Sequence, residues 1–317
     1  MNPDPIQTYQ LSRFYGSKVG CRDVNLSVRA GEIFGLLGPN GAGKSTVMKL
    51  LTGLMRPSSG GAHVMGHPIS SPASRRHVGF LPEGFRYHKW LTGGEILRLH
   101  AALHGLPRRD TERRIAAKLQ RVGLAEARDL RFAAYSKGMQ QRLGLAAALV
   151  AEPRLVFLDE PSAALDPLGR REVRNLLLEL RSGGTTVFLN SHLLGEVEMI
   201  CDTVAFMKDG RIAASGSLAD FLSEMSVLEI EIGPRASGAA AIVRDTASRL
   251  GEFGEPQVEH NRITLRMRDP ARVPEVARLI VDSGVDLLRL APRKRSLEDL
   301  FVSLMTDAGT GERADHA

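Results

Sequence analysis

Short apolar runs alternate with helix-like segments through the first part of the chain. Residues 24–28 alternate apolar and polar side chains as a strand does, and residues 44–54 have helical spacing. Four further runs have the length of buried strands: residues 33–37, 78–81, 155–158 and 186–190. Helices between such strands predict an α/β fold, built on a parallel sheet that is covered on both faces.

The stretch from residue 92 to about residue 134 has helical periodicity throughout. It indicates a helical subdomain inserted into the α/β fold, which we place at about residues 84–150. Apolar side chains at helical spacing are expected to form its core: Leu97, Leu103, Ile115, Leu119 and Val122.

Around residues 215–226 the sequence changes character, with a Gly/Ser turn, a short helix and then a strand-like run. We therefore predict a first domain at residues 1–224 and a small α+β C-terminal domain at residues 225–306. Strands and helices are expected to alternate in the second domain, beginning with a strand: residues 227–232, 239–250, 258–267, 272–283, 287–290 and 297–305. The polar tail, residues 307–317, is predicted to be disordered.

Of the 317 residues, 43% are hydrophobic and 25% are charged, as in ordinary globular proteins. The longest apolar stretch without charge, residues 143–151, is far shorter than the ~20 residues that cross a bilayer. The N-terminus lacks a basic head and an apolar stretch, so no secretory signal is predicted. We expect a cytoplasmic protein that relies on a partner for any membrane span.

The net charge of +6 is a mild excess of 42 basic over 36 acidic residues, without a dominant cluster. The arginines within residues 108–114 fit a solvated helix face better than a nucleic-acid footprint, so no nucleic-acid partner is expected. Cys21 and Cys201 lie far apart and outside any metal-binding spacing, which predicts buried free thiols.

The segment GPNGAGKS starts at Gly38, directly after one buried run and before a helix, which is the context of a phosphate-binding P-loop. Its backbone N–H groups and the helix N-terminus would present partial positive charge to the phosphates of ATP. Lys44 would reach the β- and γ-phosphate oxygens, and Ser45 would ligate Mg²⁺. The predicted nucleotide contacts are Gly38, Pro39, Asn40, Gly41, Ala42, Gly43, Lys44, Ser45 and Thr46.

Two acids, Asp159 and Glu160, end the apolar run at residues 155–158, where an open α/β sheet places its ligand groups. Asp159 is predicted to hold Mg²⁺, commonly through water. Glu160 is predicted to orient or deprotonate the attacking water. A strand that merely enters a polar turn is the alternative, and the P-loop upstream favours the catalytic interpretation.

Upstream of the two acids, the segment YSKGMQQR at residues 135–142 resembles the signature motif of ABC-type ATPases. The resemblance extends from about residue 6 to residue 222 and implies a P-loop cassette with an inserted helical subdomain. In that family, the signature serine and glycine of one subunit close over the γ-phosphate bound to the other. Ser136 and Gly138 are thereby implied to act in trans, in a dimer of cassettes. Lys137 and Met139 depart from the commonest motif and are similar to exporter-type members.

Three more positions resemble motifs of this family. Tyr15 resembles the aromatic residue that stacks on adenine, although ordinary packing is the alternative for a lone tyrosine. Asp166 resembles part of the loop that crosses the dimer interface. His192 resembles the switch histidine that contacts the γ-phosphate, whereas a lone histidine at a strand end is usually structural.

Glu83 occupies the position where the family usually has a glutamine that links Mg²⁺ to the membrane-domain interface. A subset of exporter-type ATPases resembles this sequence in having Leu-Pro-Glu there, so Glu83 is a predicted contact of nucleotide and metal. Residues 85–91, which include the sole Trp90, predict a docking surface for a membrane subunit, with local packing of Trp90 as the alternative. His100 and His104 lack a third metal ligand and are expected at the surface.

The resemblance implies the ATP-hydrolysing subunit of an ABC-2-type exporter, a homodimer that drives separate integral membrane permease subunits. It also implies a peripheral position on the inner face of the cell membrane. Two alternatives stay open: a soluble ABC-type ATPase that acts as a conformational clamp on ribosomes or DNA, and a non-enzymatic nucleotide-binding regulator. The single cassette disfavours the first, and the presence of Lys44, Asp159, Glu160 and His192 disfavours the second.

Overall fold

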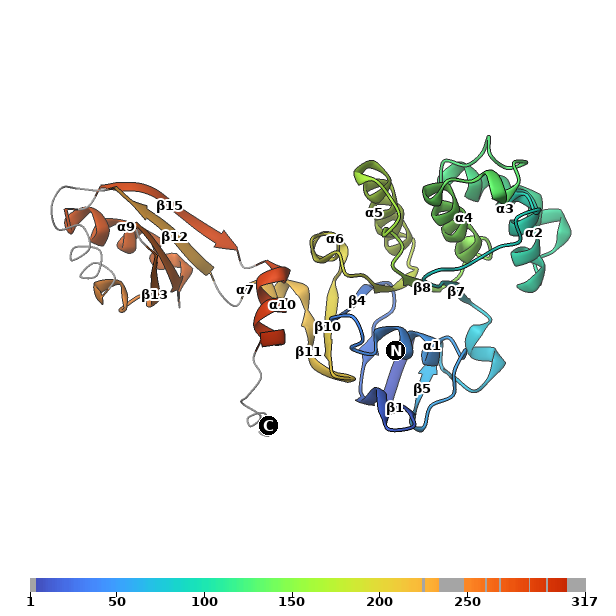
Figure 1. The fold of residues 1–317 in the computed structure, drawn as a ribbon, viewed down its shortest axis with the longest axis horizontal. Coiled ribbons are helices and arrows are strands. Elements are labelled where there is room, and N and C mark those ends of the chain that lie inside the picture. The colour runs from blue at the N-terminus through green and yellow to red at the C-terminus, as the bar shows by residue number, and fades with distance from the viewer. Residues whose placement is uncertain are drawn as a thin grey trace. The chain divides into compact units, whose positions relative to one another are not determined.

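The computed structural model describes residues 4–223, 226–233, 248–259, 261–267, 269–284, 286–294 and 296–306. The chain forms two units, which divide between Ser217 and Leu218 (Figure 1). The short helix α7 (Leu218–Ser223), which lies before the predicted boundary at residue 224, thus falls in the second unit. The predicted tail lies outside the described residues. None of the helices described is long and apolar enough to cross a bilayer.

A six-stranded sheet forms the centre of the first unit, in the order β11-β10-β4-β9-β8-β7. Its strands span β4 (Ile33–Leu37), β7 (Val78–Leu81), β8 (Leu155–Asp159), β9 (Thr186–Asn190), β10 (Thr203–Lys208) and β11 (Arg211–Ser217). All neighbours pair in parallel except β11 with β10. Because parallel strands end at the same edge, the loops after β4, β8 and β9 meet there.

A second, antiparallel sheet has the order β2-β1-β5-β6, with β3 beside β1. Its strands span β1 (Ile6–Tyr15), β2 (Lys18–Val24), β3 (Ser27–Val28), β5 (Ser59–Val64) and β6 (His67–Pro68). Helix α1 (Lys44–Leu51) shares one buried core with residues of both sheets, through Val47, Met48 and Leu51. Helices α5 (Pro167–Ser182) and α6 (Leu194–Ile200) cover the other face of the parallel sheet (Figure 1). Both faces of the parallel sheet are therefore covered, as predicted.

Two predicted elements of the first unit have different bounds. The strand expected at residues 24–28 is wrong, because the backbone of Asp23 turns into the left-handed region (φ 51°) and β2 ends at Val24. The next residues contact β1 at Thr8, where Leu26 N donates to Thr8 Oγ1 at 2.7 Å and Thr8 N donates to the Leu26 carbonyl oxygen at 2.9 Å. The helix expected at 44–54 already ends at Leu51, followed by Gly53 in the left-handed conformation that terminates many helices.

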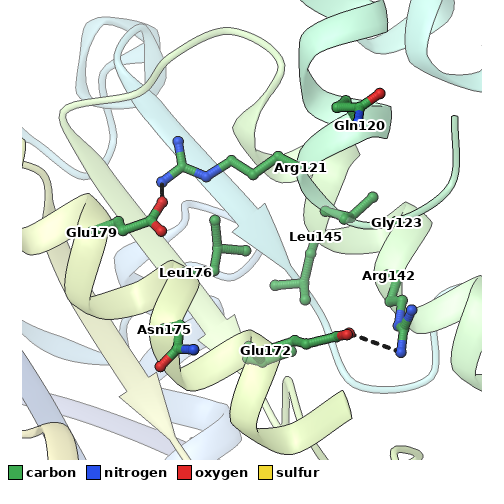
Figure 2. A pocket seen from close by; sticks show the side chains of 11 residues that line it. Gln120, Arg121, Gly123, Arg142, Leu145, Glu172, Asn175, Leu176 and Glu179 are labelled. Atoms are coloured by element: carbon green, nitrogen blue, oxygen red, sulfur yellow. Dashed lines mark hydrogen bonds and ion pairs between the residues drawn. The ribbon is translucent and has the colours of Figure 1, made fainter. Parts of the chain in front are cut away.

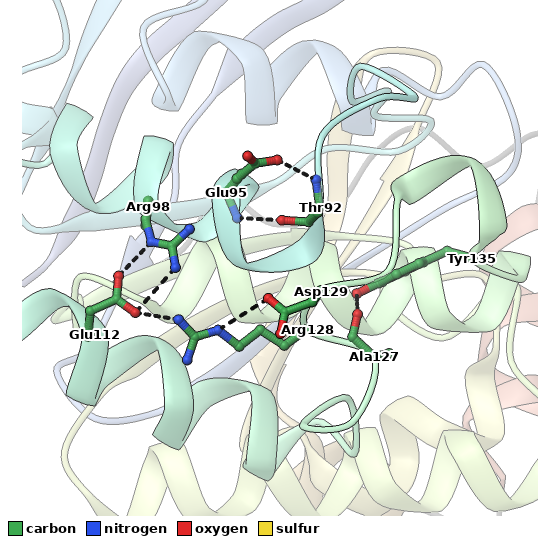
Figure 3. Close-up of polar contacts among 8 residues, drawn as sticks. All are labelled: Thr92, Glu95, Arg98, Glu112, Ala127, Arg128, Asp129 and Tyr135. Atoms are coloured by element: carbon green, nitrogen blue, oxygen red, sulfur yellow. Dashed lines mark hydrogen bonds and ion pairs between the residues drawn. The ribbon is translucent and has the colours of Figure 1, made fainter.

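The helical subdomain contains α2 (Gly93–Leu103), α3 (Arg108–Arg121), the 3₁₀ turn Phe132–Ala134 and α4 (Lys137–Leu149). Another 3₁₀ turn, Pro72–Arg75, contacts β5, β6 and β7 instead. A reciprocal cap starts α2: Glu95 N donates to Thr92 Oγ1, and Thr92 N donates to the Glu95 carboxylate (Figure 3). The Glu112 carboxylate of α3 accepts from Arg98 of α2 and from Arg128 (Figure 3). These contacts hold the subdomain's helices and connecting loop together.

Four of the five predicted core residues of this subdomain are buried: Leu97, Ile115, Leu119 and Val122. The prediction for Leu103 is wrong, because its side chain is 76% exposed. Leu97 and Ala101 are four positions apart and share the buried face of α2. Leu103 follows Ala101 by two positions, which is about 200° around a helix and places it on the opposite face.

A cleft of about 330 Å³ lies between α3, α4 and α5. Two ion pairs cross it, Arg121 with Glu179 and Arg142 Nη2 with Glu172 Oε2 at 2.9 Å (Figure 2). Leu145 and Leu176 form part of its apolar lining. The cleft thus separates the helical subdomain from α5, and the two Arg–Glu ion pairs connect the subdomain to that helix.

The second unit is built on the antiparallel sheet β13-β14-β12-β15. Its elements are β12 (Ser226–Ile232), β13 (Gly254–Glu259), β14 (Arg262–Met267), the 3₁₀ turn Pro270–Arg272, α9 (Val273–Asp282), β15 (Leu287–Lys294) and α10 (Leu297–Thr306). The single strand expected at 258–267 is wrong: it is a hairpin in which Glu259 pairs with Arg262, because Asn261 favours a turn. Most of the predicted helix at 239–250 lies outside the described residues.

Candidate functional site

A pocket of about 710 Å³ opens at the carboxyl edge of the parallel sheet. Most of the predicted nucleotide and catalytic residues line it: Tyr15, Asn40, Gly41, Gly43, Lys44, Ser45, Thr46, Glu83, Glu160 and His192. The lining is completed by five residues that were not predicted: Lys18, Val19, Gly20, Ala163 and Asn190. Segments far apart in the sequence therefore converge on one cavity, whose size suits a nucleotide.

The P-loop connects β4 to the N-terminus of α1 and requires glycine at Gly43, directly before that helix. Gly43 has φ 107°, and a Cβ there would lie 2.1 Å from the Gly20 carbonyl oxygen. The loop is pinned to the fold because Gly210 N donates to the Ala42 carbonyl oxygen at 3.0 Å. No side chain caps α1 at Gly43, so its first N–H groups face the pocket as anion donors. Gly38, Pro39 and Ala42 shape the loop rather than line the pocket.

Lys44 lies at the first position of α1 and is buried. Its Nζ donates to the carbonyl oxygens of Gly38, at 2.7 Å, and Pro39, at 3.1 Å, across the loop. Burial lowers the pKa of Lys44, while the negative charges of Glu160, Asp159 and Glu83 act against that shift. The ammonium group therefore lies beside the acids and the loop that would hold phosphates.

Asp159 and Asn190 lie opposite each other at the ends of β8 and β9. Asn190 Nδ2 donates to Asp159 Oδ1. Burial is the largest cause that raises the pKa of Asp159, and the nearby Glu83 carboxylate adds to it. Asn190 Oδ1 is buried and has no hydrogen-bond partner within the described residues. An unpaired buried oxygen beside a carboxylate fits a hydrated cation or a water molecule.

No cluster of three or more His, Cys, Asp or Glu side chains in the described part of the chain could hold a metal by itself. A cation beside Ser45 and Asp159 would therefore need phosphate oxygens and water as further ligands, which is the usual arrangement of Mg²⁺ with a nucleotide. The Ser45 hydroxyl, the Asp159 carboxylate and the unpaired Asn190 Oδ1 are hard oxygen donors of the right kind. The residues present fit a nucleotide-bound Mg²⁺.

Glu160 has an unusual backbone conformation for its residue type, with φ 52°. Such a left-handed residue costs about 1 kcal/mol or more and persists only where its surroundings hold it. Its N–H donates to the Asn190 carbonyl oxygen at 2.9 Å, and its Oε2 lies 2.8 Å from His192 Nδ1. The predicted switch histidine and the predicted base therefore form a pair.

The electrostatics of Glu160 suit a proton acceptor. Burial is the largest cause that raises its pKa, and pairing with His192 acts against it. The Glu160 side chain is only 11% exposed, whereas that of His192 is 58% exposed. A buried carboxylate with a raised pKa accepts a proton from water more readily than an exposed one.

Tyr15 lies at the mouth of the pocket and is half exposed. The Arg13 guanidinium carbon lies 5.1 Å from the centroid of its ring. A Cβ on Gly20 would lie 2.6 Å from Tyr15 Cε2, so the ring packs closely on that glycine. The adenine-stacking role of Tyr15 stays a prediction.

The structure places the signature residues and Asp166 outside this pocket. Ser136 is exposed and caps α4, where its Oγ accepts from Met139 N at 3.2 Å, and Gly138 follows in the first turn. Asp166 caps α5, where its Oδ1 accepts from Gly169 N at 2.8 Å. Within one chain, these three predicted contacts are not part of the cavity that contains the P-loop.

The segment after β7 contains Glu83 and the predicted docking surface. Glu83 is exposed and lines the pocket. Trp90 is 66% exposed and stacks on His88, with ring centroids 4.4 Å apart, so it does not pack into the core.

His100 is half-buried rather than on the surface, because its ring packs edge-on against Tyr87 at 5.5 Å. His104 is exposed, and Cys21 and Cys201 are buried free thiols, as predicted.

Comparison with known proteins decides the family. A family model described as ABC transporter matches residues 21–163. An uncharacterized ABC transporter ATP-binding protein of Nostoc sp. is 42% identical over 234 residues, which cover 73% of this chain and 70% of the relative. The chain belongs to the ABC transporter family. This ABC ATPase is also 32% identical over 322 residues to the daunorubicin/doxorubicin resistance ATP-binding protein DrrA of Streptomyces peucetius, an alignment that covers 99% of the chain and 96% of DrrA.

This ABC ATPase is also similar to the solved structure of an ATP-binding subunit of an ABC transporter. It aligns with a TM-score of 0.64 and 34% identity, over 68% of this chain and 90% of that one. The predicted α/β P-loop fold, the assignment to ABC transporter ATP-binding subunits and the ATPase activity are confirmed. The alignment with DrrA also spans the second unit, so that unit has a counterpart in a relative.

Proposed function

We propose that this ABC ATPase is a peripheral subunit on the cytoplasmic face of the cell membrane, where it powers export through separate integral membrane permease subunits. The similarity to DrrA along nearly the whole chain supports export, because DrrA is a resistance protein. The absence of a membrane-spanning helix among the described residues is compatible with partners that supply the spans. The exposed Trp90 and its neighbours after β7 are the proposed contact with those partners.

The observation that carries the proposal is the incomplete pocket. Lys44, Glu160 and His192 line it, whereas Ser136 and Gly138 do not. Ser136 instead stands exposed at the N-terminal end of α4, where a second cassette can reach it. Two copies of this chain would each complete the other's pocket, with Asp166 near the contact between them. The proposed active form is a homodimer with two ATP sites.

Within each site, the residues of this chain have separate tasks. The P-loop N–H groups and Lys44 bind and orient the phosphates of ATP, and Ser45 and Asp159 would hold Mg²⁺. Mg²⁺ supplies positive charge that stabilises the developing negative charge on the phosphates. Glu160 orients a water molecule and accepts its proton. His192, paired with Glu160, keeps that carboxylate directed toward the pocket.

Purification of the tagged ABC ATPase from native membranes tests the proposed function. We expect an integral membrane protein to co-purify with it and to increase its ATPase rate. Co-purification with ribosomes or DNA, and no membrane partner, would contradict the proposal in favour of the clamp.

Glu83 adds a carboxylate near Asp159, where it raises the pKa of that residue. We propose that Glu83 contacts the metal. Glu83→Gln should then raise the Mg²⁺ concentration required for half-maximal ATPase activity by up to about fivefold, because the interaction of an exposed carboxylate with a cation contributes ~1 kcal/mol. Glu83→Ala should raise it further, and ATP binding without metal should stay unchanged.

Glu126→Gln, on an exposed position of the helical subdomain, is the matched control and should behave as wild type. Mg²⁺ titrations of both Glu83 variants that coincide with wild type would remove Glu83 from the metal site. A loss of stimulation by the membrane partner alone would instead assign Glu83 to the coupling contact.

A further inference from the structure

Gln141 connects α4 to the loop that follows β8. Its Nε2 donates to the carbonyl oxygen of Glu160 at 3.1 Å and to that of Pro161 at 3.0 Å. Gln141 is half-buried and comes from the same helix that begins with the signature residues Ser136 and Gly138. Both N–H groups of one amide are therefore used to hold the backbone of the catalytic loop.

The loop that Gln141 holds contains the strained residue of the site. Glu160 is in the left-handed region, which a residue with a side chain keeps only where neighbouring groups fix it. Its N–H is bound by the Asn190 carbonyl of β9, and its carbonyl oxygen is bound by Gln141 of α4. The two polar groups of this backbone are thus fixed from two different elements. The direction of the Glu160 carboxylate depends on both.

We propose that Gln141 is a positioning residue for ATP hydrolysis, which fixes the Glu160 backbone and links it to the signature helix. The inference rests on the proposed function, in which Glu160 acts on the nucleotide of its own chain and Ser136 on that of the partner. A shift of α4 at one site would move Gln141 and so change the position of Glu160 at the other. Gln141 thereby connects the two sites of the dimer through one side chain.

Gln140 and Gln141 are neighbours in α4, but their side chains contact different segments. Gln140 Nε2 donates to the Tyr135 carbonyl oxygen at 3.0 Å, next to Ser136. Gln141 contacts the loop after β8 instead. Loss of the Gln141 amide should therefore disturb Glu160 and leave the Ser136 end of the helix in place.

Steady-state ATPase kinetics of Gln141→Leu and Gln141→Glu test the proposal, since both variants keep a side chain of similar length and lack the amide donor. We expect kcat to fall by about ten- to one-hundredfold with KM for ATP unchanged, because a small displacement of a catalytic group has effects of that size. Gln120→Leu, at an exposed position of α3, is the matched control and should keep wild-type kcat. Thermal unfolding confirms that the variants are folded.

A second measurement uses the Glu160→Gln background, in which ATP is expected to hold a stable dimer. If Gln141 acts only through Glu160, adding Gln141→Leu should leave the fraction of ATP-held dimer unchanged in size-exclusion chromatography. Loss of that dimer would show that Gln141 supports the signature segment and would overturn the proposal. So would wild-type kcat in a folded Gln141→Leu variant. If wild type lacks ATPase activity and Glu160→Gln forms no dimer, the proposed function itself fails, and the inference fails with it.

Discussion

Replacement of Lys44 by alanine is expected to lower the ATPase rate by about 10²- to 10³-fold, the effect of removing one preorganised charged donor from a phosphoryl-transfer site. The ammonium group is buried at the start of α1 and lies beside Glu160 and Asp159. Lys18 is the one other lysine among the residues that line the pocket. Lys18 lies at the start of β2 and is exposed. Phosphate release measured over a range of ATP concentrations gives the result.

The control for this variant is Lys49→Ala, which removes the same side chain from an exposed position of the same helix. It should hydrolyse ATP at the wild-type rate. Since Lys44 Nζ also bonds to the Gly38 and Pro39 carbonyl oxygens, thermal unfolding of Lys44→Ala must be compared with wild type. Unchanged turnover in Lys44→Ala would contradict the assignment of residues 38–45 as the catalytic P-loop.

Glu160→Gln should retain ATP affinity and lose about 10²- to 10⁴-fold in hydrolysis, the range that a positioned general base contributes. An amide has the same shape as the carboxylate and can still accept a hydrogen bond from His192 Nδ1, so the geometry of the pair is conserved. It cannot take a proton from water. Because ATP then persists between two cassettes, a dimer should appear in size-exclusion chromatography with ATP.

The same variant with ADP is the control, and it should elute as wild type does with ADP, because the γ-phosphate is required to join the two chains. ATP affinity is measured separately by equilibrium binding. Near-normal turnover of Glu160→Gln would remove Glu160 from the role of base. Slow turnover without an ATP-dependent dimer would count against the proposed pairing of Ser136 with the partner's pocket.

Much of the site could be predicted from the sequence because its parts are continuous segments. The P-loop needs glycine at fixed places between a strand and a helix, and Gly43 has no room for a Cβ. Asp159 and Glu160 follow an apolar run that is entirely buried. The parallel sheet with cover on both faces was predicted in the same way, since strands without polar alternation are buried on both faces, but its strand order was not.

Other features depend on which residues meet in space. Leu103 has the right residue type for a core, but the orientation of α2 turns it toward solvent. The bounds of β13 and β14 depend on their antiparallel pairing, which runs from Gly254 with Met267 to Glu259 with Arg262. The antiparallel sheet of the first unit is held by pairing between β1 and strands at both sides, β2 and β5, which is a long-range property.

The sequence by itself determined the chemistry of this ABC ATPase: a phosphate-binding loop, two acids at a strand end and a histidine after another strand. Spacing within a segment is sufficient for these, because each depends on local backbone geometry. Only the tertiary structure decided their surroundings. It paired Asn190 with Asp159 and directed the Gln141 amide to the Glu160 backbone. Contacts between residues distant in the sequence leave no local pattern, because they are fixed by the packing of whole helices and strands.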